Sequence, residues 1–314
     1  MTEAAAATLA RDRTLNLFAK PMTYVTGKGG VGKTTIAAAM ALLAADQRRR
    51  VLVCELGSDG HLARLFGRTI DHEPTSVSPF VDAANFSAEE GLVATLTSVL
   101  PVERIIRAVV QNRVLQMFME TAPSVREAVL LDALGRHFQT KKYDNIIVDL
   151  PASGHAVTML GVPQMIMKLM RRGPVAKKAE ALEAEIFDPA RAQILLVALP
   201  EALPVQETIE LSQKLVAATR MGQVGIVLNS SAPHLVDKKE QALLDKIKQE
   251  AAQGSELRRH ALHLLQAAER DEKALRELAQ ATGLPVFRLP RIEDANGFQD
   301  ILGIAKAALA SYVA

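Results

Sequence analysis

A glycine-rich segment near the N-terminus ends in a lysine and a threonine and reads Gly27-Lys28-Gly29-Gly30-Val31-Gly32-Lys33-Thr34. Glycines allow successive backbone N–H groups to converge on phosphate oxygens, which β-carbons would obstruct. The spacing Gly-x-x-x-x-Gly-Lys-Thr lets Lys33 reach the β- and γ-phosphates of a nucleotide, and the Thr34 hydroxyl can bind Mg²⁺. The segment therefore predicts a loop that binds a nucleoside triphosphate together with Mg²⁺.

The residues on both sides of this segment predict a strand before it and a helix after it. A β-type run covers 22–26, an alanine-rich helical stretch covers 33–47, and the apolar run 51–54 follows. A strand, helix and strand at this spacing form a βαβ unit, which implies a parallel sheet. Four later runs are short and continuously apolar, as expected of strands buried on both faces: 145–150, 193–199, 223–228 and 285–289. The predicted fold class is α/β, with a mostly parallel central sheet flanked by helices and with helical insertions.

The chain is predicted to form one nucleotide-binding domain over residues 21–314. Residues 1–20 have no continuous apolar stretch and are expected to be a flexible extension. Patterns typical of helices alone fill 86–140 and 156–187, where the alternation of strands and helices is interrupted. We therefore expect these two blocks to form a helical subdomain.

Composition limits the classes of partner and compartment. The 314 residues include 37 basic and 35 acidic side chains, a net charge of +2, so no broad basic field favours nucleic acid as a partner. The single cysteine, Cys54, cannot form an internal disulfide or a Cys-x-x-Cys zinc site. The N-terminus does not resemble a secretory signal, and no apolar run approaches the length of a membrane span. We therefore expect a cytoplasmic protein without stable membrane insertion.

Lys28, at the start of the glycine-rich segment, has no task in an ordinary phosphate-binding loop (P-loop). With Lys28 and Thr35 included, the segment resembles the deviant P-loop Lys-Gly-Gly-x-Gly-Lys-[Thr/Ser]-Thr. That motif belongs to the ATPase class of MinD, ParA, the nitrogenase iron protein and the arsenical-pump ATPases. The resemblance implies that Lys28 reaches into the nucleotide site of a facing subunit. Because the chain has one such loop, it implies a dimer with ATP between the subunits, formed by like chains or with a paralogue.

Two members of that class fit less well. The nitrogenase iron protein binds its cluster with two thiolates per subunit, and this chain has Cys54 alone. MinD ends in a basic amphipathic membrane helix, whereas residues 304–314 contain one lysine, too little for anchoring at about 1 kcal/mol per basic residue. Residues 198–208 instead resemble the loop between nucleotide and dimer interface in the ArsA and tail-anchored-protein-targeting ATPase family.

Further segments resemble that same family. Asp149-Leu150-Pro151-Ala152-Ser153-Gly154-His155 resembles its switch II pattern Asp-Thr-Ala-Pro-Thr-Gly-His, which implies that Asp149, at a strand end, holds a Mg²⁺-bound water. Asn229, directly after a strand, matches the family's adenine-reading asparagine, whose amide can both donate and accept. Pro290 and Ile292 lie in the segment that matches the family's C-terminal lining of the nucleotide site. The resemblance implies ATP and Mg²⁺ as ligands.

The segment that aligns with the family's switch I departs from it. Switch I reads Asp-Pro-Ala-His, and its aspartate orients the attacking water; aligned on Leu62 and Phe66, Gly57 takes that place here. Glycine cannot polarise water, but Glu55 and Asp59 lie two residues to either side and are candidate catalytic replacements. Three readings stay open: slow hydrolysis, a neighbouring acid in the aspartate's role, or a paralogous subunit that supplies the competent site.

The sequence argues against arsenite as a ligand and leaves an apolar partner as a hypothesis. An arsenite site needs thiolates, and one cysteine cannot make it. Six of the ten methionines fall in the two helical blocks: Met117, Met119, Met159, Met165, Met167 and Met170. A stripe at i, i+3, i+4, i+7 and i+8 suits either an ordinary core or an adaptable groove for a hydrophobic helix, and consists of Val162, Met165, Ile166, Leu169 and Met170.

Together these features predict a dimeric, Mg²⁺-dependent ATPase of the ArsA and targeting type, with a hydrophobic helical client as a hypothesis. In this prediction Lys28 and Lys33 act on the nucleotide. The switch segments transmit the closing movement of the two subunits to the helical subdomain. Two alternatives remain: a non-hydrolysing nucleotide-binding subunit of a hetero-oligomer, and a positioning ATPase like ParA or MinD.

Overall fold

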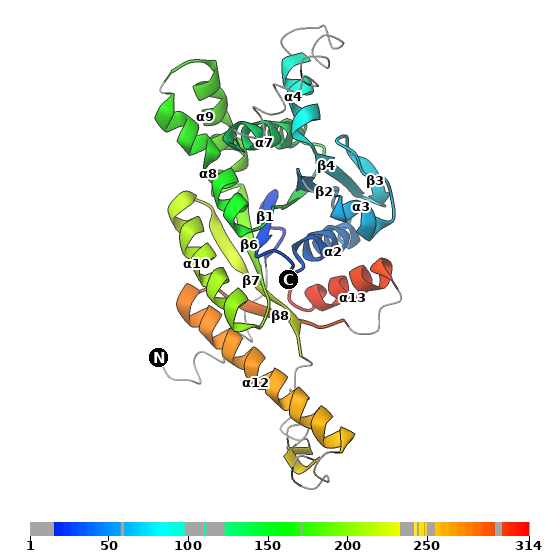
Figure 1. Cartoon of the computed structure of the whole chain (residues 1–314). Coiled ribbons are helices and arrows are strands. Elements are labelled where there is room, and N and C mark those ends of the chain that lie inside the picture. The colour runs from blue at the N-terminus through cyan, green and yellow to red at the C-terminus, as the bar shows by residue number, and fades with distance from the viewer. Residues whose placement is uncertain are drawn as a thin grey trace.

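The computed structural model describes residues 16–57, 60–97, 110, 123–170, 172–232, 242–243, 245–247, 249, 255–292 and 297–313. Within these residues, strands alternate with helices around one sheet (Figure 1). The strands are β1 (Met22–Gly27), β2 (Val51–Leu56), β3 (Thr75–Ser78), β4 (Val81–Phe86), β5 (Asn145–Asp149), β6 (Ala192–Ala198), β7 (Gly222–Ser231) and β8 (Val286–Pro290). The helices are α2 (Lys33–Asp46), α3 (His61–Phe66), α4 (Ala88–Thr97), α7 (Pro123–Gln139), α8 (Ser153–Leu169), α9 (Pro174–Ile186), α10 (Ala202–Ala218), α12 (Glu256–Thr282) and α13 (Phe298–Ala310).

The sheet has the strand order β3-β4-β2-β5-β1-β6-β7-β8. Neighbouring strands pair in parallel, except β3 and β4, which are antiparallel. β1, β2, β5 and β6 are buried along their whole length, which explains why their sequences are mostly apolar rather than alternating. The predicted fold class, an α/β protein with a mostly parallel central sheet, is confirmed.

The edge formed by β3 and β4 was not expected from the sequence. β3 is a short polar strand whose residues are partly buried or exposed, and β4 carries Asp82 and Asn85 at its less buried positions. Neither strand therefore has the continuous apolar run by which the inner strands are recognised. β4 is held by its parallel pairing with β2, a tertiary contact that a local pattern does not report.

Helices cover both faces of the sheet and form one apolar core on each side. On one face, α2, α3 and α13 pack on the sheet around side chains such as Ile36, Leu62 and Leu302. On the other face, α7, α8, α10 and α12 pack around Leu131, Leu160 and Leu215. The loop between β1 and α2 thus starts from a strand that is enclosed by helices on both sides.

Four helices gather at one end of the molecule, beyond the sheet (Figure 1). α7 contacts α4, α8 and α9, and α8 also contacts α9 and α10. These helices fall within the blocks 86–140 and 156–187, except that α8 begins at Ser153; residues 98–109 and 111–122 of the first block lie outside the described residues. The division into a nucleotide domain with a helical subdomain, and the extension at 1–20, stay predictions.

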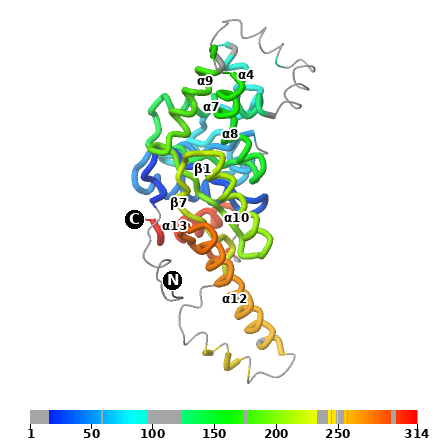
Figure 2. Tube along the Cα trace, turned by 90° about the vertical axis from the view of Figure 1, so that its left-hand side faces the viewer, coloured from blue at the N-terminus to red at the C-terminus, as the bar shows by residue number. Residues whose placement is uncertain are grey.

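α12 runs away from the sheet in both views, with its C-terminal part beside α10 (Figures 1 and 2). It has 27 residues, but charged side chains are spread along it. In the described part of the chain, no helix combines the length and the apolar character needed to cross a membrane.

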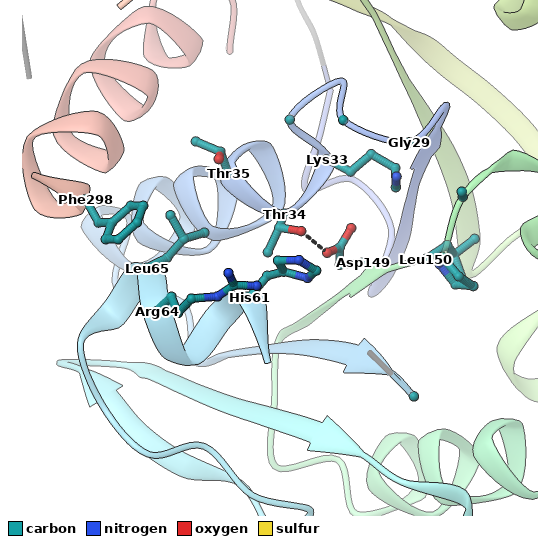
Figure 3. Close-up of a pocket in the computed structure, with 15 residues that line it drawn as sticks. Gly29, Lys33, Thr34, Thr35, His61, Arg64, Leu65, Asp149, Leu150 and Phe298 are labelled. Carbon is teal, nitrogen blue, oxygen red and sulfur yellow. Dashed lines mark hydrogen bonds between the residues drawn. The ribbon is translucent and has the colours of Figure 1, made fainter. Parts of the chain in front are cut away.

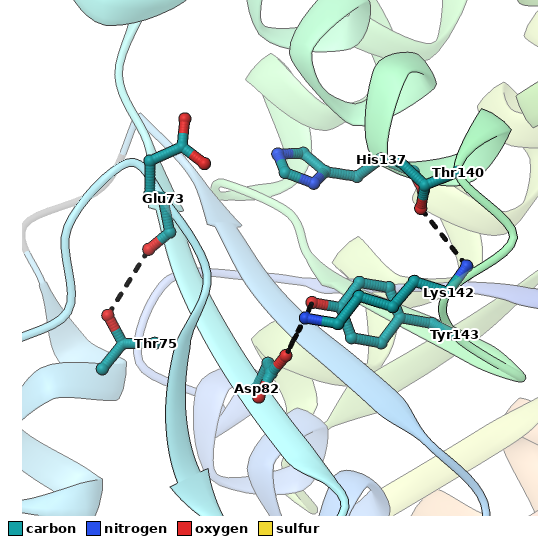
Figure 4. A network of polar contacts seen from close by, with 7 residues as sticks. All are labelled: Glu73, Thr75, Asp82, His137, Thr140, Lys142 and Tyr143. Carbon is teal, nitrogen blue, oxygen red and sulfur yellow. Dashed lines mark hydrogen bonds and ion pairs between the residues drawn. The ribbon is translucent and has the colours of Figure 1, made fainter.

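Polar contacts join β4 to the turn between α7 and β5 (Figure 4). Asp82 accepts hydrogen bonds from Lys142 Nζ and from the Tyr143 hydroxyl, both at 2.8 Å. Beside them the His137 ring stacks on Phe86 in β4, with ring centroids 5.1 Å apart. Burial lowers the pKa of His137, so the ring favours its neutral form. These contacts fix the position of α7 against the edge of the sheet.

Candidate nucleotide-binding site

The glycine-rich loop lies at the carboxyl edge of the sheet, between β1 and α2. A β-carbon on Gly27 would lie 2.2 Å from the backbone oxygen of Val197 in β6. Gly30 and Gly32 have φ of +82° and +93°, a region that residues with a β-carbon rarely adopt. The loop needs glycine at these three positions because of close approach or backbone conformation.

The first turn of α2 is open to an anion. Its N-cap is Gly32, no side chain caps the helix, and the first turn has no acidic residue. The N–H groups of a helix's first turn lack intrahelical partners, and the helix dipole adds partial positive charge there. This end of α2 therefore suits a phosphate group.

A cavity of about 560 Å³ opens in front of the loop (Figure 3). Its wall comes from the loop, α2, α3, the segment after β5, and the start of α13. The lining residues are Gly29, Gly30, Gly32, Lys33, Thr34, Thr35, Gly57, His61, Arg64, Leu65, Asp149, Leu150, Pro151, Ala152 and Phe298. A cavity of this volume is within the range of about 300–1,000 Å³ typical of small-molecule sites.

Lys33 and Asp149 face the same cavity from α2 and from the end of β5. The Lys33 ammonium donates a hydrogen bond to the backbone oxygen of Lys28 at 3.1 Å. Burial lowers the pKa of Lys33, and the nearby Asp149 carboxylate opposes that shift. Burial raises the pKa of Asp149 to about 7 with help from Glu55, while Thr34 and Lys33 oppose the rise. Each charge is thus held in a partly dry setting, where a phosphate or a cation would interact strongly.

Thr34 and Asp149 form a pair of oxygen donors that fits Mg²⁺. The Thr34 hydroxyl donates to Asp149 Oδ2 at 2.5 Å (Figure 3). The other carboxylate oxygen, Oδ1, is buried and accepts no hydrogen bond from the described residues. Hard cations prefer such oxygens, and Mg²⁺ is commonly held by one or two protein oxygens together with phosphates and waters. Among the described residues, no group of three or more His, Cys, Asp or Glu side chains could hold a metal ion, so phosphates and waters would have to complete the shell.

A second cavity of about 240 Å³ adjoins the first along α2. Thr35 lines both cavities, and the second also contains Asn229, Pro290 and Ile292. The Asn229 amide donates to the backbone oxygen of Val31 at 2.9 Å. Apolar residues of α13 supply part of the remaining wall: Ile301, Ile304, Ala305 and Ala308. The structure therefore brings the predicted adenine-side residues together, next to the predicted phosphate loop.

Val31 and Lys28 lie outside both walls. Val31 is buried in the core beneath the loop, where it anchors the loop to the protein. The Lys28 ammonium extends from the loop and pairs with Glu207 of α10, with Nζ 2.5 Å from Oε1. The Lys28 side chain is 46% exposed, so it lies at the surface beside the cavity.

Glu55 is not brought to the cavity wall. It is fully buried, and its two carboxylate oxygens accept hydrogen bonds from the backbone amides of His61 at 3.1 Å and Leu62 at 3.2 Å. These are the contacts of a cap on the N-terminus of α3. Gly57 does line the cavity, with φ of +67°, and Asp59 lies outside the described residues.

Four lining residues were not singled out from the sequence: His61, Arg64, Leu65 and Phe298. His61 and Arg64 are three residues apart on α3, so they share one helix face. That spacing, directly after the switch I segment, is a signal that could have indicated both. Phe298 lies some 230 residues farther along the chain, and only the fold places it at the cavity.

The glycine-rich loop lies between an inner strand of a parallel sheet and the following helix. Lysine, threonine and aspartate surround the cavity in front of the loop. These features define a P-loop nucleotide-binding protein. Within that class, the chain belongs to the anion-transporting ATPase family, ArsA, whose model matches residues 21–179.

Curated relatives carry related names. The chain is 30% identical over 221 residues to the ATPase BagA of Mycobacterium tuberculosis, which covers 67% of this chain and 64% of the relative. It is 30% identical over 223 residues to a Halobacterium salinarum protein described as an arsenical pump-driving ATPase, and the match covers 65% of this chain and 33% of the relative. It is 26% identical over 244 residues to an ATPase ASNA1 homolog of Babesia bovis, covering 68% and 66%. The matched regions thus span between a third and two thirds of these relatives.

Replacing Gly32 by alanine is expected to destabilise the fold. The new β-carbon would meet Asn229 Nδ2 at 2.4 Å, and the φ of +93° is strained for alanine. Backbone strain of this kind costs about 1–3 kcal/mol. Gly29→Ala is the matched control, because nothing lies within 4 Å of a β-carbon there, and we expect a change within about 0.5 kcal/mol. Urea unfolding compares the two variants, and equal unfolding midpoints would contradict the close packing of Gly32 against Asn229.

Proposed function

We propose that the chain is a dimeric switch protein that binds and hydrolyses ATP with Mg²⁺. The observation that carries this proposal is the cavity in which Lys33, Thr34 and Asp149 meet in front of the glycine-rich loop. Membership of an ATPase family supports the same reading. The loop amides and the N-terminus of α2 would bind the phosphates, and Lys33 would contact the β- and γ-phosphates.

Thr34 and Asp149 are the residues that would hold Mg²⁺. When bound, the ion neutralises charge on the β- and γ-phosphates. Asp149 would act through the oxygen that accepts no hydrogen bond from the described residues. A carboxylate with a pKa near 7 can exchange its proton for a cation at neutral pH without a large cost.

The base would lie in the second cavity. Thr35 connects the two cavities, so a nucleotide with its phosphates at the loop would extend its base toward Asn229, Pro290 and Ile292. Apolar atoms of α13 would cover one side of the base. An asparagine amide can pair with the donor and the acceptor on the edge of adenine.

Dimerisation would bring Lys28 of one subunit to the nucleotide of the other. In the single chain Lys28 pairs with Glu207, and the two side chains are 46% and 24% exposed. Ion pairs this exposed contribute about 0.2–1 kcal/mol, which a triphosphate with several negative charges can outweigh. Lys28 is thus available for transfer from Glu207 to a facing nucleotide.

Lys33→Ala is expected to abolish ATP binding or turnover, because it removes the half-buried cation of the phosphate site. The expected loss in turnover is on the order of 100-fold or more. Titration with a fluorescent ATP analogue and a phosphate-release assay measure the two effects. Lys214→Ala removes an exposed lysine of α10 and serves as the control. Unchanged binding and turnover in Lys33→Ala would refute the phosphate-site assignment.

Lys28→Ala is expected to keep ATP binding within one subunit but to lose ATP-dependent dimerisation. Light scattering with and without ATP measures the mass of the wild type and of the variant. Glu207→Gln frees Lys28 from its partner and should favour the dimer.

A wild type that binds ATP and stays monomeric would instead support a hetero-oligomer with a paralogue. ATP-dependent, salt-sensitive DNA binding, or lipid binding, would favour a positioning ATPase.

A hydrophobic client is the second part of the proposal, and the end of α8 is the observation that favours it. Val162 and Met159 are buried and Ile166 packs on the core, so this side of the predicted stripe is ordinary core. Leu169 and Met170 are 76% and 50% exposed at the end of α8, and Met165 is also exposed. Met117 and Met119 lie outside the described residues. The exposed side chains would bind an apolar helix, and α7 would link them to the nucleotide site.

Leu169→Glu is expected to weaken binding of an apolar helical peptide by about tenfold or more, since a buried leucine contributes about 1.5–3 kcal/mol. Fluorescence anisotropy of a labelled poly-leucine-type helix, with and without ATP, measures the affinity. Val216→Glu places the same charge at an exposed apolar position of α10 and is the control. No peptide binding by the wild type in any nucleotide state would remove the client from the proposal.

A further inference from the structure

Gly57 aligns with the switch I aspartate of the family, and residues of α7 occupy the space that a side chain at this position would need. A β-carbon on Gly57 would lie 3.2 Å from Leu130 Cδ1 and 3.4 Å from Arg126 Nη2, both on α7. The φ of +67° adds strain for any residue with a β-carbon. A carboxylate at this position would therefore displace α7 or change the backbone. The group that orients a water in this cavity must come from a different position.

Among the described residues that line the switch I side of the cavity, His61 is the one whose side chain can accept a hydrogen bond from water. It is the first residue of α3, and its side chain is 48% exposed. Its imidazole lines the same cavity as the Thr34–Asp149 pair (Figure 3). Arg64, on the same face of α3, has only donors and suits a phosphate oxygen instead.

The Glu55 carboxylate lies beside the His61 ring. His61 Nδ1 lies 3.5 Å from Glu55 Oε1. The Glu55 carboxylate is fixed in turn, because it is fully buried and accepts from the amides of His61 and Leu62. A carboxylate beside Nδ1 favours the proton on that nitrogen, which leaves Nε2 as an acceptor.

We propose that His61, positioned by Glu55, orients the attacking water in ATP hydrolysis. The proposal rests on the proposed ATPase function. Nε2 accepts a hydrogen bond from the water, whose oxygen forms a bond to the γ-phosphorus. The bond between the γ-phosphorus and the β–γ bridging oxygen breaks, and its electron pair stays on ADP. The second water proton passes to a γ-phosphate oxygen, so that the products are ADP and inorganic phosphate.

The test compares His61→Ala, His61→Gln and Glu55→Gln with the wild type. His61→Ala should lower kcat by about 100-fold while the affinity for ATP stays within about twofold. Glutamine keeps a hydrogen-bonding group at similar reach, so His61→Gln should recover at least about tenfold of that loss. Glu55→Gln keeps an acceptor for one of the two α3 amides and should lower kcat by about tenfold through His61. His263→Ala removes an exposed histidine of α12 and is the control.

A second readout does not depend on turnover. ADP with aluminium fluoride resembles the transition state and should bind the wild type more tightly than ADP alone. This gain in affinity over ADP alone should be at least about tenfold smaller in His61→Ala and should be partly restored in His61→Gln. Urea unfolding midpoints report whether each variant is folded.

The outcomes separate this inference from the function on which it rests. A wild type that hydrolyses ATP, with His61→Ala behaving like His263→Ala in both readouts, overturns the inference and leaves the function standing. A wild type that binds ATP without turnover overturns hydrolysis, and the inference with it. If His61→Ala unfolds, the folded His61→Gln decides: activity within about tenfold of that of the wild type supports orientation by a hydrogen bond, and a larger loss overturns it.

Discussion

The nucleotide site depends on how closely the loop after β1 approaches β6 and β7. The backbone oxygen of Val197 and the amide of Asn229 leave no room for β-carbons on Gly27 and Gly32. Asn229 also donates to the backbone oxygen of Val31, whose side chain is buried. The loop is therefore fixed by contacts with the sheet before any phosphate is bound, and a preorganised ring of amides does not have to be ordered at the moment of binding.

The parallel register of the strands places two carboxylates beside that loop. Asp149 is the register partner of Val25 in β1 and of Glu55 in β2, so two carboxylates end neighbouring strands. Glu55 is satisfied by two amides of α3, whereas Asp149 keeps one buried oxygen without a partner among the described residues. An uncompensated buried carboxylate costs several kcal/mol, so Asp149 favours a proton or a bound cation. This difference between the two acids follows from their neighbours and not from their residue type.

The sequence predicted those parts of the molecule that are local or that match a known motif. The loop Gly27–Thr34 and its strand and helix are found where expected, because glycine spacing and short apolar runs are local signals. Asn229, Pro290 and Ile292 were indicated by resemblance, and they line one cavity although they are far apart in the chain. β3 and β4 gave no local signal, since a polar edge strand has no continuous apolar run. The role of Glu55 as a helix cap could not be predicted, because it depends on the direction in which the chain turns after β2.

α7 is the element that can connect the site to the helices at the end of the molecule. Arg126 and Leu130 pack against Gly57, so any movement of the switch I segment meets α7. Glu127, on the same turn, is buried, with one oxygen that has no partner among the described residues, and burial raises its pKa while His155 and Arg126 oppose the rise. His155 belongs to the segment that follows Asp149, so α7 lies beside both segments that border the cavity. Because α7 also contacts α8 and α9, a shift of either segment by the γ-phosphate would reach the exposed end of α8 through packed side chains. The glycine at position 57 is thus explained by packing: it is the residue that allows α7 to approach the cavity so closely.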